Sequence, residues 1–319
     1  MIVRWGLEEL PGLLAELDIE RPFLVSSPRW PAPVEVEGTW TEVPSDRIQE
    51  AAAATSGADG LLALGGGSAI DLAKAISVET SLPLVSVPTT YSGAEWTPSF
   101  GIRDHDRLMR GGGSGANLAG IVYEPTLTLD LPNAETVGTS LNALAHTAEA
   151  LYVKGRNEEG DREALAGAAL ISQWLPKVVD DGEGLEARRG LLEGALHAGA
   201  ALAAAGLGLG HAIAQALGGR YGLPHGAMNA LALPAALRFN EPVAAAEIAR
   251  FGAAMGTDDP AGRVEELARL GGFERLRDFG VPREELDEVA EAAAVRGGAL
   301  ANPRSASPAE IAELLRSVW

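Results

Sequence analysis

Residues 61–78 read LLALGGGSAIDLAKAISV, and this stretch decides the fold. The four apolar residues at its start form a short run that is typical of a buried strand, and they lead directly into three glycines. The spacing of Ala, Ile and Leu then predicts a helix over residues 68–78. Glycine has no Cβ, so the backbone can turn tightly there and approach a ligand, and the helix start offers free N–H groups. We therefore predict a site for an anion such as a pyrophosphate, formed by Gly65, Gly66, Gly67 and Ser68.

Similar apolar runs recur on both sides of this unit. Strands are predicted at residues 21–27, within 34–43, and at 61–64, 84–87 and 121–129. An Ala-rich segment with Ser45 as its N-cap predicts a helix over residues 45–55. Strands that alternate with helices in this way predict a mostly parallel sheet. The Gly-rich segment 110–120 is expected to be a mobile loop at a domain junction.

The character of the sequence changes after Pro132. From Ala134 onward the pattern is helical and rich in Ala, Leu and Glu, and runs of β-branched residues disappear. The predicted fold class is therefore α/β, with a Rossmann-like nucleotide-binding domain over residues 1–132. An all-helical domain, expected to carry the substrate or metal site, follows over residues 133–319.

Composition excludes several classes of protein. The 319 residues carry 25 Lys and Arg against 44 Asp and Glu, and the net charge of −19 repels nucleic acid. The absence of cysteine excludes disulfides and thiolate metal sites. No apolar run reaches the length of a membrane span, and the first residues do not resemble a signal peptide, so we expect a cytoplasmic protein without a membrane partner.

A second ligand-binding segment follows the strand at residues 84–87. Thr89 and Thr90 supply hydroxyl groups at the carboxyl end of that strand, where open α/β sheets bind ligands, although a hydroxyl-rich turn is the alternative. Asp71 is a further candidate cofactor-binding residue, and it follows Ser68 by three residues, as in a capping box. Lys74 lies on the same helix and is a candidate substrate ligand, against the alternative of a solvated helix residue.

Polar residues are spaced so that they share helix faces in the second half of the chain. Asn142 and His146 are four residues apart, His211 and Gln215 repeat this spacing, and His225 opens a third helical run. Converging helices would bring Asn142, His146, His211 and His225 together, which suits a divalent metal or a small polar substrate. A satisfied buried histidine is the alternative for each, and we leave His105 and His197 to it.

Together these motifs resemble a known family. GGGSAIDLAKAI, VPTTYSGAEWTP, SLNALAHTAEALY, GHAIAQALGGRYGLPHG and the late Asn302-Pro303-Arg304 are similar to the iron-containing (group III) alcohol dehydrogenases, and within them to the maleylacetate reductases. The resemblance runs from about residue 2 to residue 318. It implies a Rossmann-like domain and a helical domain, as in dehydroquinate synthase-like folds, with NADH or NADPH as cofactor.

The resemblance also implies roles for individual residues. The turn from Gly65 to Ser68 would bind the pyrophosphate, and Thr89 and Thr90 would line the cofactor. In metal-dependent members an Asp and three His hold Fe²⁺ or Zn²⁺, at the positions of Asn142, His146, His211 and His225. Asn142 departs from this pattern because an amide offers a cation no negative charge. Gln215 is a second departure, since many members have a further His there. Maleylacetate reductases tend to carry Asn at the first position, and the resemblance implies that they work without metal, so we expect none here.

The end of the first core strand bears on the choice of cofactor. Many NAD-preferring members have an Asp there, which would repel a 2′-phosphate, whereas this chain has Ser27 with Arg29 close by. We therefore expect NADPH to be accepted, alongside NADH. An ordinary surface charge is the alternative for Arg29.

The predicted reaction is the reduction of maleylacetate or a similar oxo or unsaturated dicarboxylate, as in the degradation of aromatic compounds. His146, His211 and His225 would bind a carboxylate or stabilise enolate charge, and Tyr91 or a His would supply the proton. Arg304 is a candidate anchor for a substrate carboxylate, with a structural salt bridge as the alternative.

Three other functions remain open. They are a metal-dependent alcohol dehydrogenase, a non-catalytic nucleotide-binding protein with a degenerate metal site, and a dehydroquinate synthase-type lyase. The lyase would need a basic phosphate pocket in the helical half, where the sequence shows none. We expect a homodimer, since dimers are usual in the family.

Overall fold

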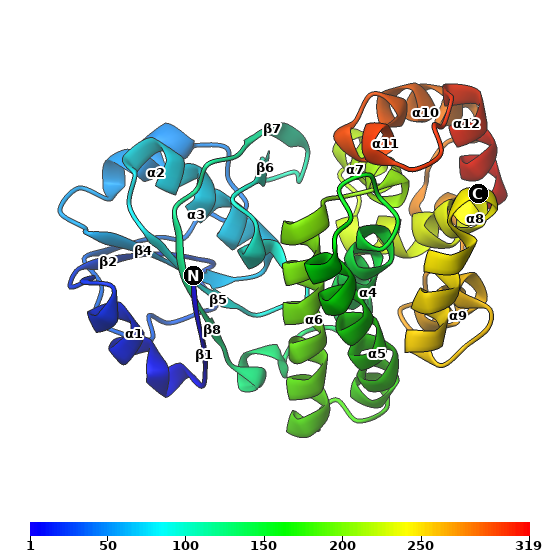
Figure 1. Ribbon diagram of the computed structural model, residues 1–319. Helices are drawn as coiled ribbons and strands as arrows, with labels where there is room; N and C mark the ends of the chain where they lie inside the picture. The colour runs from blue at the N-terminus through cyan, green and yellow to red at the C-terminus, as the bar shows by residue number, and fades with distance from the viewer. The chain divides into compact units, whose positions relative to one another are not determined.

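The computed structural model describes residues 1–319 and divides them into two compact units, Met1–Asp130 and Leu131–Trp319 (Figure 1). The first unit contains every strand of the chain, and the second is built only from helices. This is the predicted α/β fold class with an all-helical second half, and the prediction is confirmed.

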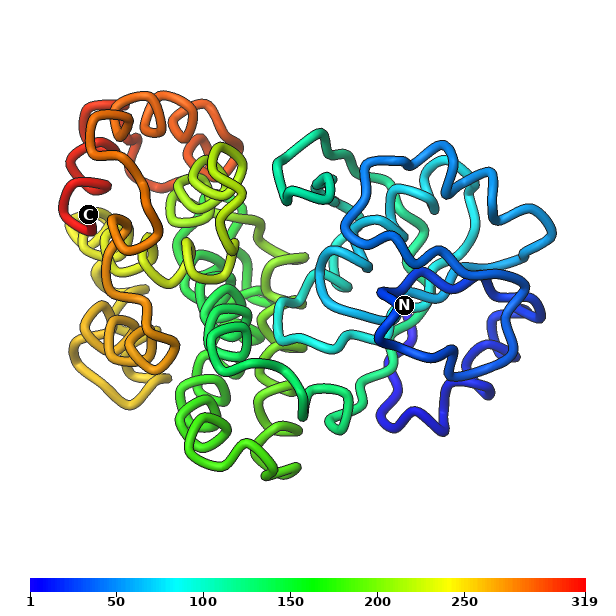
Figure 2. The backbone as a smooth tube through the Cα atoms, turned by 180° about the vertical axis from the view of Figure 1, so that it is seen from behind, coloured from blue at the N-terminus to red at the C-terminus, as the bar shows by residue number.

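The main sheet of the first unit is parallel throughout. In spatial order its six strands are β1 (Ile2–Trp5), β8 (Leu118–Tyr123), β5 (Leu84–Pro88), β4 (Gly60–Gly65), β2 (Pro22–Ser26) and β3 (Gly38–Trp40). The central strands β2, β4 and β5 are buried along their whole length, which explains why they are apolar runs without alternation. The tube in Figure 2 follows the same segments from the opposite side.

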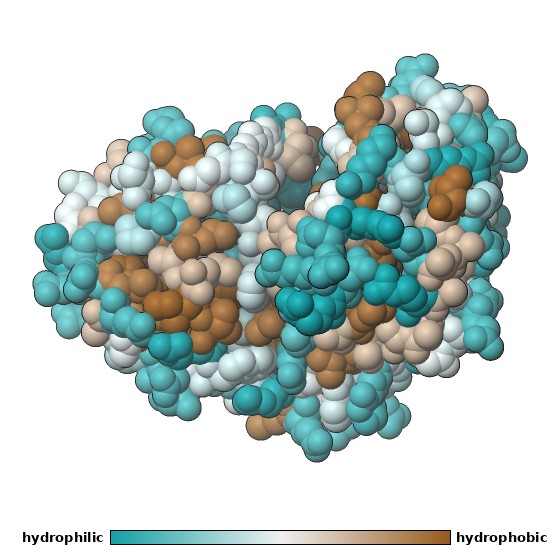
Figure 3. Space-filling model, in the orientation of Figure 1, coloured by the Kyte–Doolittle hydropathy of each residue, from teal (hydrophilic) through white to brown (hydrophobic).

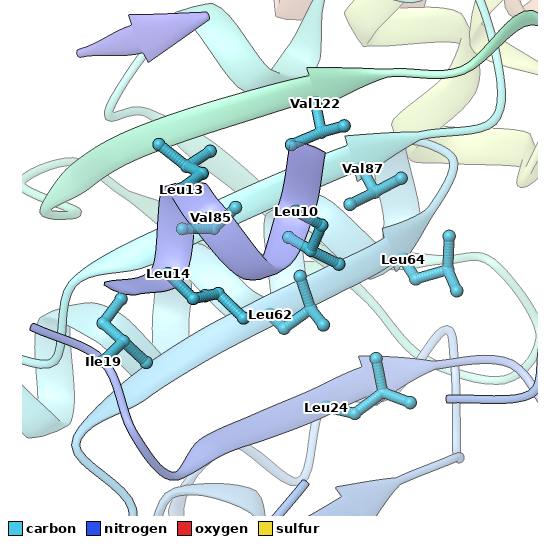
Figure 4. Close-up of a cluster of buried hydrophobic side chains, with 10 residues drawn as sticks. All are labelled: Leu10, Leu13, Leu14, Ile19, Leu24, Leu62, Leu64, Val85, Val87 and Val122. Carbon is cyan, nitrogen blue, oxygen red and sulfur yellow. The ribbon is translucent and has the colours of Figure 1, made fainter. Parts of the chain in front are cut away.

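Alternate residues of these strands face two separate hydrophobic clusters. Leu62 and Leu64 of β4 point toward helix α1 (Leu10–Glu16), whose Leu10 and Leu13 lie over the sheet (Figure 4). Leu61 and its neighbours pack on the other side, against α2 (Ile48–Ala54) and α3 (Gly67–Thr80). Successive side chains of a strand point to opposite faces, so helices cover the sheet on both sides.

The boundaries of several elements differ from the prediction. Helix α2 begins at Ile48 rather than Ser45, whose hydroxyl accepts from the N–H of Arg47 as part of the preceding turn. Strand β8 ends at Tyr123, and the 3₁₀ helix η3 (Pro125–Thr128) follows because Pro125 cannot continue the strand ladder and Glu124 accepts from the N–H of Thr126.

The Gly-rich segment forms part of a hairpin rather than a loop throughout. Strand β7 (Met109–Gly113) pairs antiparallel with β6 (Phe100–Arg103) in a separate two-stranded sheet. Backbone hydrogen bonds hold the two strands together, so the glycines can form a strand without the alternating side chains that usually indicate one. Residues 118–120 already belong to β8. The short 3₁₀ helices of the first unit besides η3 are η1 (Leu7–Glu9) and η2 (Ala94–Trp96).

The second unit is a bundle around helix α4 (Asn133–Ala150), which is buried almost completely from Thr136 onward. This helix contacts α5 (Glu158–Asp180), α6 (Leu185–Ala205), α7 (Leu209–Tyr221) and α8 (His225–Met255). The remaining elements are α9 (Pro260–Arg269), η4 (Leu276–Phe279), η5 (Arg283–Glu285), α10 (Leu286–Ala294), α11 (Gly297–Ala301) and α12 (Pro308–Ser317). Because α4 is central, its polar residues are held among apolar neighbours.

The surface and the helix lengths bear on membrane binding. On the face drawn in Figure 3, apolar side chains gather into patches between hydrophilic ones. No single helix has the length and apolar character to cross a bilayer. The pair α6 and α7 satisfies that criterion only when joined, and the two helices are bent by 102° relative to each other.

Candidate active site

The glycine turn between β4 and α3 has the geometry of an anion site. Gly66 is the N-cap of α3, and the hydroxyl of Ser68 does not cap the helix, so the predicted capping box with Asp71 is wrong. The first amide groups of a helix have no partner within it and carry the positive end of its dipole. A Cβ on Gly66 would lie 2.8 Å from Cγ2 of Thr90, so only glycine fits between the turn and the neighbouring strand end.

The predicted cofactor residues of the first unit gather at one edge of the sheet. Gly65 pairs with Pro88 across β4 and β5, and its carbonyl accepts from the N–H of Thr89 at 3.0 Å. Ser26 pairs with Leu64, which brings Ser27 beside the same turn. An anion-binding turn flanked by small and hydroxyl residues fits a dinucleotide, whose pyrophosphate the amides of α3 would hold.

Asp71 and Lys74 have partners inside the first unit. The Lys74 ammonium is fully buried and donates to Oδ1 of Asp71 at 3.1 Å and to the carbonyl of Ser99 at 2.8 Å. Oδ2 of Asp71 accepts from the N–H of Gly101 at 3.2 Å. The two side chains therefore join α3 to the β6–β7 hairpin. Lys74 is not the solvated residue considered as its alternative, and roles for the pair in ligand binding stay predictions.

The loop after β5 contains a buried carboxyl group that the sequence did not single out. Glu95 accepts from the hydroxyl of Tyr123 at 2.6 Å, and that hydroxyl accepts from Nε1 of Trp96 at 2.8 Å. Burial raises the pKa of Glu95, although the Tyr123 hydrogen bond and the charge of Lys74 act against the rise. The group favours its protonated form more than an exposed Glu does.

Two further predicted residues of the first unit have defined surroundings. Tyr91 is fully buried, and its hydroxyl donates to Oγ1 of Thr128 at 3.0 Å. Because that proton is already engaged, Tyr91 is a poorer donor than a group facing the site, and its catalytic role stays a prediction. The Arg29 guanidinium lies over the ring of Trp30 at 4.6 Å.

The predicted histidine cluster forms within the second unit. His146 of α4 and His211 of α7 stack with ring centroids 4.6 Å apart, and the centroids of His211 and His225 are 5.9 Å apart. Nδ1 of His146 and Nε2 of His211 are buried without hydrogen-bond partners. Buried polar atoms in proteins are almost always satisfied, so these two nitrogens point to a ligand at the cluster.

Asn142 joins the cluster through a second amide. Its Oδ1 accepts from Nδ2 of Asn229 at 2.7 Å, and its Nδ2 faces Nε2 of His146 at 3.4 Å. The Asn229 amide also faces Nε2 of His225 at 3.1 Å. Asn229 is fully buried and was missed from the sequence, although it lies four residues after His225 on the same helix face.

Glu149 is the second residue that the sequence did not reveal. It lies three residues after His146 on α4 and is fully buried. Its Oε2 contacts Nδ1 of His211 at 2.6 Å and accepts from the N–H of Gly208 at 2.6 Å, while Oε1 accepts from the N–H of His211 at 3.1 Å. The signal available in the sequence was its position on the helix face that carries Asn142 and His146.

One histidine of the cluster, His146, is shifted toward its neutral form. Burial, followed by the proximity of His211 and His225, lowers the pKa of His146 well below its usual value. His146 is therefore a neutral ring at physiological pH.

These residues, as arranged, do not fit a divalent metal. No group of three or more His, Asp or Glu side chains is placed to hold an ion. The Asn142 oxygen is engaged by Asn229, and the amides of Asn142 and Asn229 face the Nε2 atoms of His146 and His225. A cation would have to displace these contacts without a carboxylate among the four predicted ligands.

Arg304 and the outlying histidines lie in separate contacts. The Arg304 guanidinium donates to the carbonyl of Phe239 and to Glu310, and it lies over the Phe239 ring at 3.9 Å. This matches the structural alternative for Arg304, and substrate binding by it stays a prediction. His197 pairs with Glu163 at 2.7 Å, and His105 is an exposed residue beside Asp106.

Comparison with known proteins agrees with this geometry. Residues 136–319 match the C-terminal part of the Fe-containing alcohol dehydrogenase family, and residues 6–114 match iron-containing alcohol dehydrogenase. The chain belongs to the iron-containing alcohol dehydrogenase family. It is thus an oxidoreductase of that family, and the predicted resemblance is confirmed.

The relatives within the iron-containing alcohol dehydrogenase family include maleylacetate reductases. The enzyme of Burkholderia cepacia is 37% identical over 79% of this chain and 72% of its own length. That of Pseudomonas knackmussii is 32% identical over 98% of this chain and 93% of its own. The structure of maleylacetate reductase from Agrobacterium tumefaciens superimposes with a TM-score of 0.90 at 28% identity, covering 100% of this chain and 95% of that one.

Proposed function

We propose that the protein is an NAD(P)H-dependent reductase of maleylacetate or a similar unsaturated oxo dicarboxylate, and that it works without a metal. The proposal that no metal is needed rests on the hydrogen bond between Asn229 and Asn142 at 2.7 Å. This bond occupies Oδ1 of Asn142, the atom at the position where metal-dependent members have a carboxylate ligand. The likeness to maleylacetate reductases supports the choice of substrate.

The cofactor supplies a hydride when it is bound. In the first unit, the amides at the start of α3 would hold its pyrophosphate, and Thr90 would line the same edge of the sheet. Ser27 presents no carboxylate to a 2′-phosphate, so both NADH and NADPH are proposed as donors.

The residues of the second unit would act on the substrate. Addition of a hydride to a carbon–carbon double bond conjugated with a ketone leaves an enolate, which then takes a proton at carbon. His225 is the first residue of α8, where the helix dipole favours negative charge, so it can stabilise a carboxylate or the enolate oxygen. Nε2 of His211 is unpartnered and lies away from Glu149, so His211 is the better-placed proton donor. As an imidazolium it would give its Nε2 proton to the enolate carbon and return to a neutral ring that keeps its N–H at Nδ1.

A spectrophotometric screen tests this function. Oxidation of NADPH and NADH is followed at 340 nm with maleylacetate, simple ketones and aldehydes, each with and without EDTA. We expect turnover with maleylacetate that EDTA does not change. Activity only on simple ketones and aldehydes, lost on chelation, would overturn the proposal.

The variant N142D tests separately the proposal that the enzyme works without a metal. A carboxylate at this position supplies the charge that the amide lacks, so we expect N142D to retain Zn²⁺ or Fe²⁺ after dialysis whereas the wild type does not. Elemental analysis measures the metal per chain directly. Stoichiometric metal in the purified wild type contradicts the prediction.

The family itself favours one alternative, a metal-dependent alcohol dehydrogenase, because the matched family is described as iron-containing. The same elemental analysis and EDTA arm decide between the two. We also propose a homodimer, which sedimentation velocity would distinguish from a monomer.

A further inference from the structure

We propose that Glu149 is a positioning residue, which orients the His211 ring and determines which of its nitrogens carries the proton in the neutral ring. The argument rests on contacts inside the second unit. Its kinetic consequence alone rests on the proposed reductase function.

Two backbone N–H donors and one ring nitrogen face the carboxylate of Glu149. Three contacts converge on it, from the N–H of Gly208, the N–H of His211 and Nδ1 of His211, at 2.6, 3.1 and 2.6 Å. Both oxygens of Glu149 accept from backbone N–H groups, and a carboxylate is purely an acceptor, so we assign the N–H of the His211 ring to Nδ1. In the neutral ring, Nε2 is then left with a lone pair.

The unpartnered nitrogen lies on the opposite side of the ring from Glu149. Nε2 of His211 is buried without a partner, and the stacked His146 ring lies 4.6 Å away between centroids. With Nδ1 engaged, Nε2 is the only atom of this ring that can exchange a hydrogen bond or a proton with a ligand. Glu149 therefore prepares His211 for chemistry without itself touching the substrate.

The same carboxylate fixes the backbone that carries His211. Gly208 is the N-cap of α7 and supplies no side chain for capping, and His211 is the third residue of the helix. Glu149 accepts from both N–H groups and so caps α7 from a neighbouring helix. A Cβ on Gly208 would lie 3.0 Å from Cδ of Glu149, which explains the glycine there. The Glu149 carboxylate therefore holds both the His211 ring and the first turn of α7. The dipole of α7 favours a negative charge at this position.

The isosteric variant E149Q tests the inference. An amide has one acceptor and one donor end, so it cannot satisfy all three N–H groups at once. We expect the fraction of His211 protonated at Nε2 to rise, as measured by long-range ¹H–¹⁵N correlation spectra of protein labelled with ¹⁵N-histidine. The variant H211Q assigns the resonances.

A purely structural role would lower the melting temperature and leave the His211 tautomer unchanged. With maleylacetate as substrate, we expect E149Q to lower kcat by about tenfold or more with little change in KM, because the ring is mispositioned while the substrate contacts remain.

The matched control is E163Q. Glu163 makes the same kind of contact with Nδ1 of His197 at 2.7 Å on a partly exposed helix pair, so this variant should leave both the His211 spectrum and turnover unchanged. A wild-type His211 that is neutral and protonated at Nε2 overturns the inference, as does a folded E149Q with unchanged tautomer. Failure of the proposed function would instead appear as wild-type protein that does not reduce maleylacetate, while the spectra still test Glu149.

Discussion

Single glycines decide how closely a ligand can approach the first unit. Alanine at Gly66 would disturb the fold as well as ligand binding, because its Cβ would lie 2.8 Å from Thr90. A Cβ on Gly67 meets nothing closer than Ser92 at 3.7 Å, so this position tests ligand binding alone. Alanine at Gly67 should therefore fold normally and place its methyl group in the space next to the helix amides, where a phosphate would lie.

We expect G67A to weaken NADPH binding by about tenfold, which corresponds to about 1.4 kcal/mol, with an unchanged far-ultraviolet circular dichroism spectrum. Isothermal titration calorimetry measures the dissociation constant. The control is G12A, since a Cβ on Gly12 in α1 meets nothing within 4 Å and should at most stabilise the helix. Equal affinities for G67A and wild type would rule out the glycine turn as the pyrophosphate site.

Glu95 gives a second prediction for a single residue. Its pKa is raised in the folded protein by burial, so its contribution to stability is complete below the unfolded pKa and is lost as the pH rises through the folded value. Gln cannot ionise and still accepts from the Tyr123 hydroxyl. The free energy of unfolding of E95Q relative to wild type should therefore increase from pH 5 to pH 8, by about 1.4 kcal/mol per unit of pKa difference.

Urea denaturation at both pH values measures this change. The control is E50Q, because Arg47 lowers the pKa of Glu50 and the group stays ionised over the whole range. Its difference from wild type should be constant between pH 5 and pH 8. A constant difference for E95Q as well would mean that Glu95 is ionised in the folded protein.

Helix α8 and the segment after α11 are joined by a reciprocal amide pair. Nδ2 of Asn240 donates to Oδ1 of Asn302 at 2.9 Å, the reverse contact is 2.7 Å, and both side chains are fully buried. Removing one partner leaves the other amide buried without its contacts, so N302A should lower the free energy of unfolding by about 1–3 kcal/mol. N133A removes an exposed amide contact to Leu270 and should cost much less in the same urea titration. Equal losses would show that the buried pair adds nothing.

The sequence predicts a strand where apolar side chains determine it. It does not predict a strand that is held only by backbone hydrogen bonds. Strands β2, β4 and β5 were found because both of their faces are buried, which leaves continuous apolar runs. The sequence predicts a loop at strand β7 because Gly111 to Gly113 carry no side chains, although their backbones pair with β6.

The same distinction explains the candidate site. His146, His211 and His225 are rare residues at helical spacing, and the structure brings them together. Glu149 and Asn229 are common residue types in Ala-rich helices. Their importance lies in contacts to other helices, which spacing along one helix cannot reveal.

At the scale of the whole molecule, the order of strands differs from their order along the chain. Ile2 of β1 pairs with Gly120 of β8, so the first strand has the last strand of the sheet as its only neighbour. During synthesis, β1 leaves the ribosome while its partner is still to be translated, and strands β2 to β5 can assemble among themselves in the meantime. Completion of this edge must await residue 123, just before the helical half begins to emerge. A destabilised β1 should therefore delay closure of the sheet and leave its centre able to form.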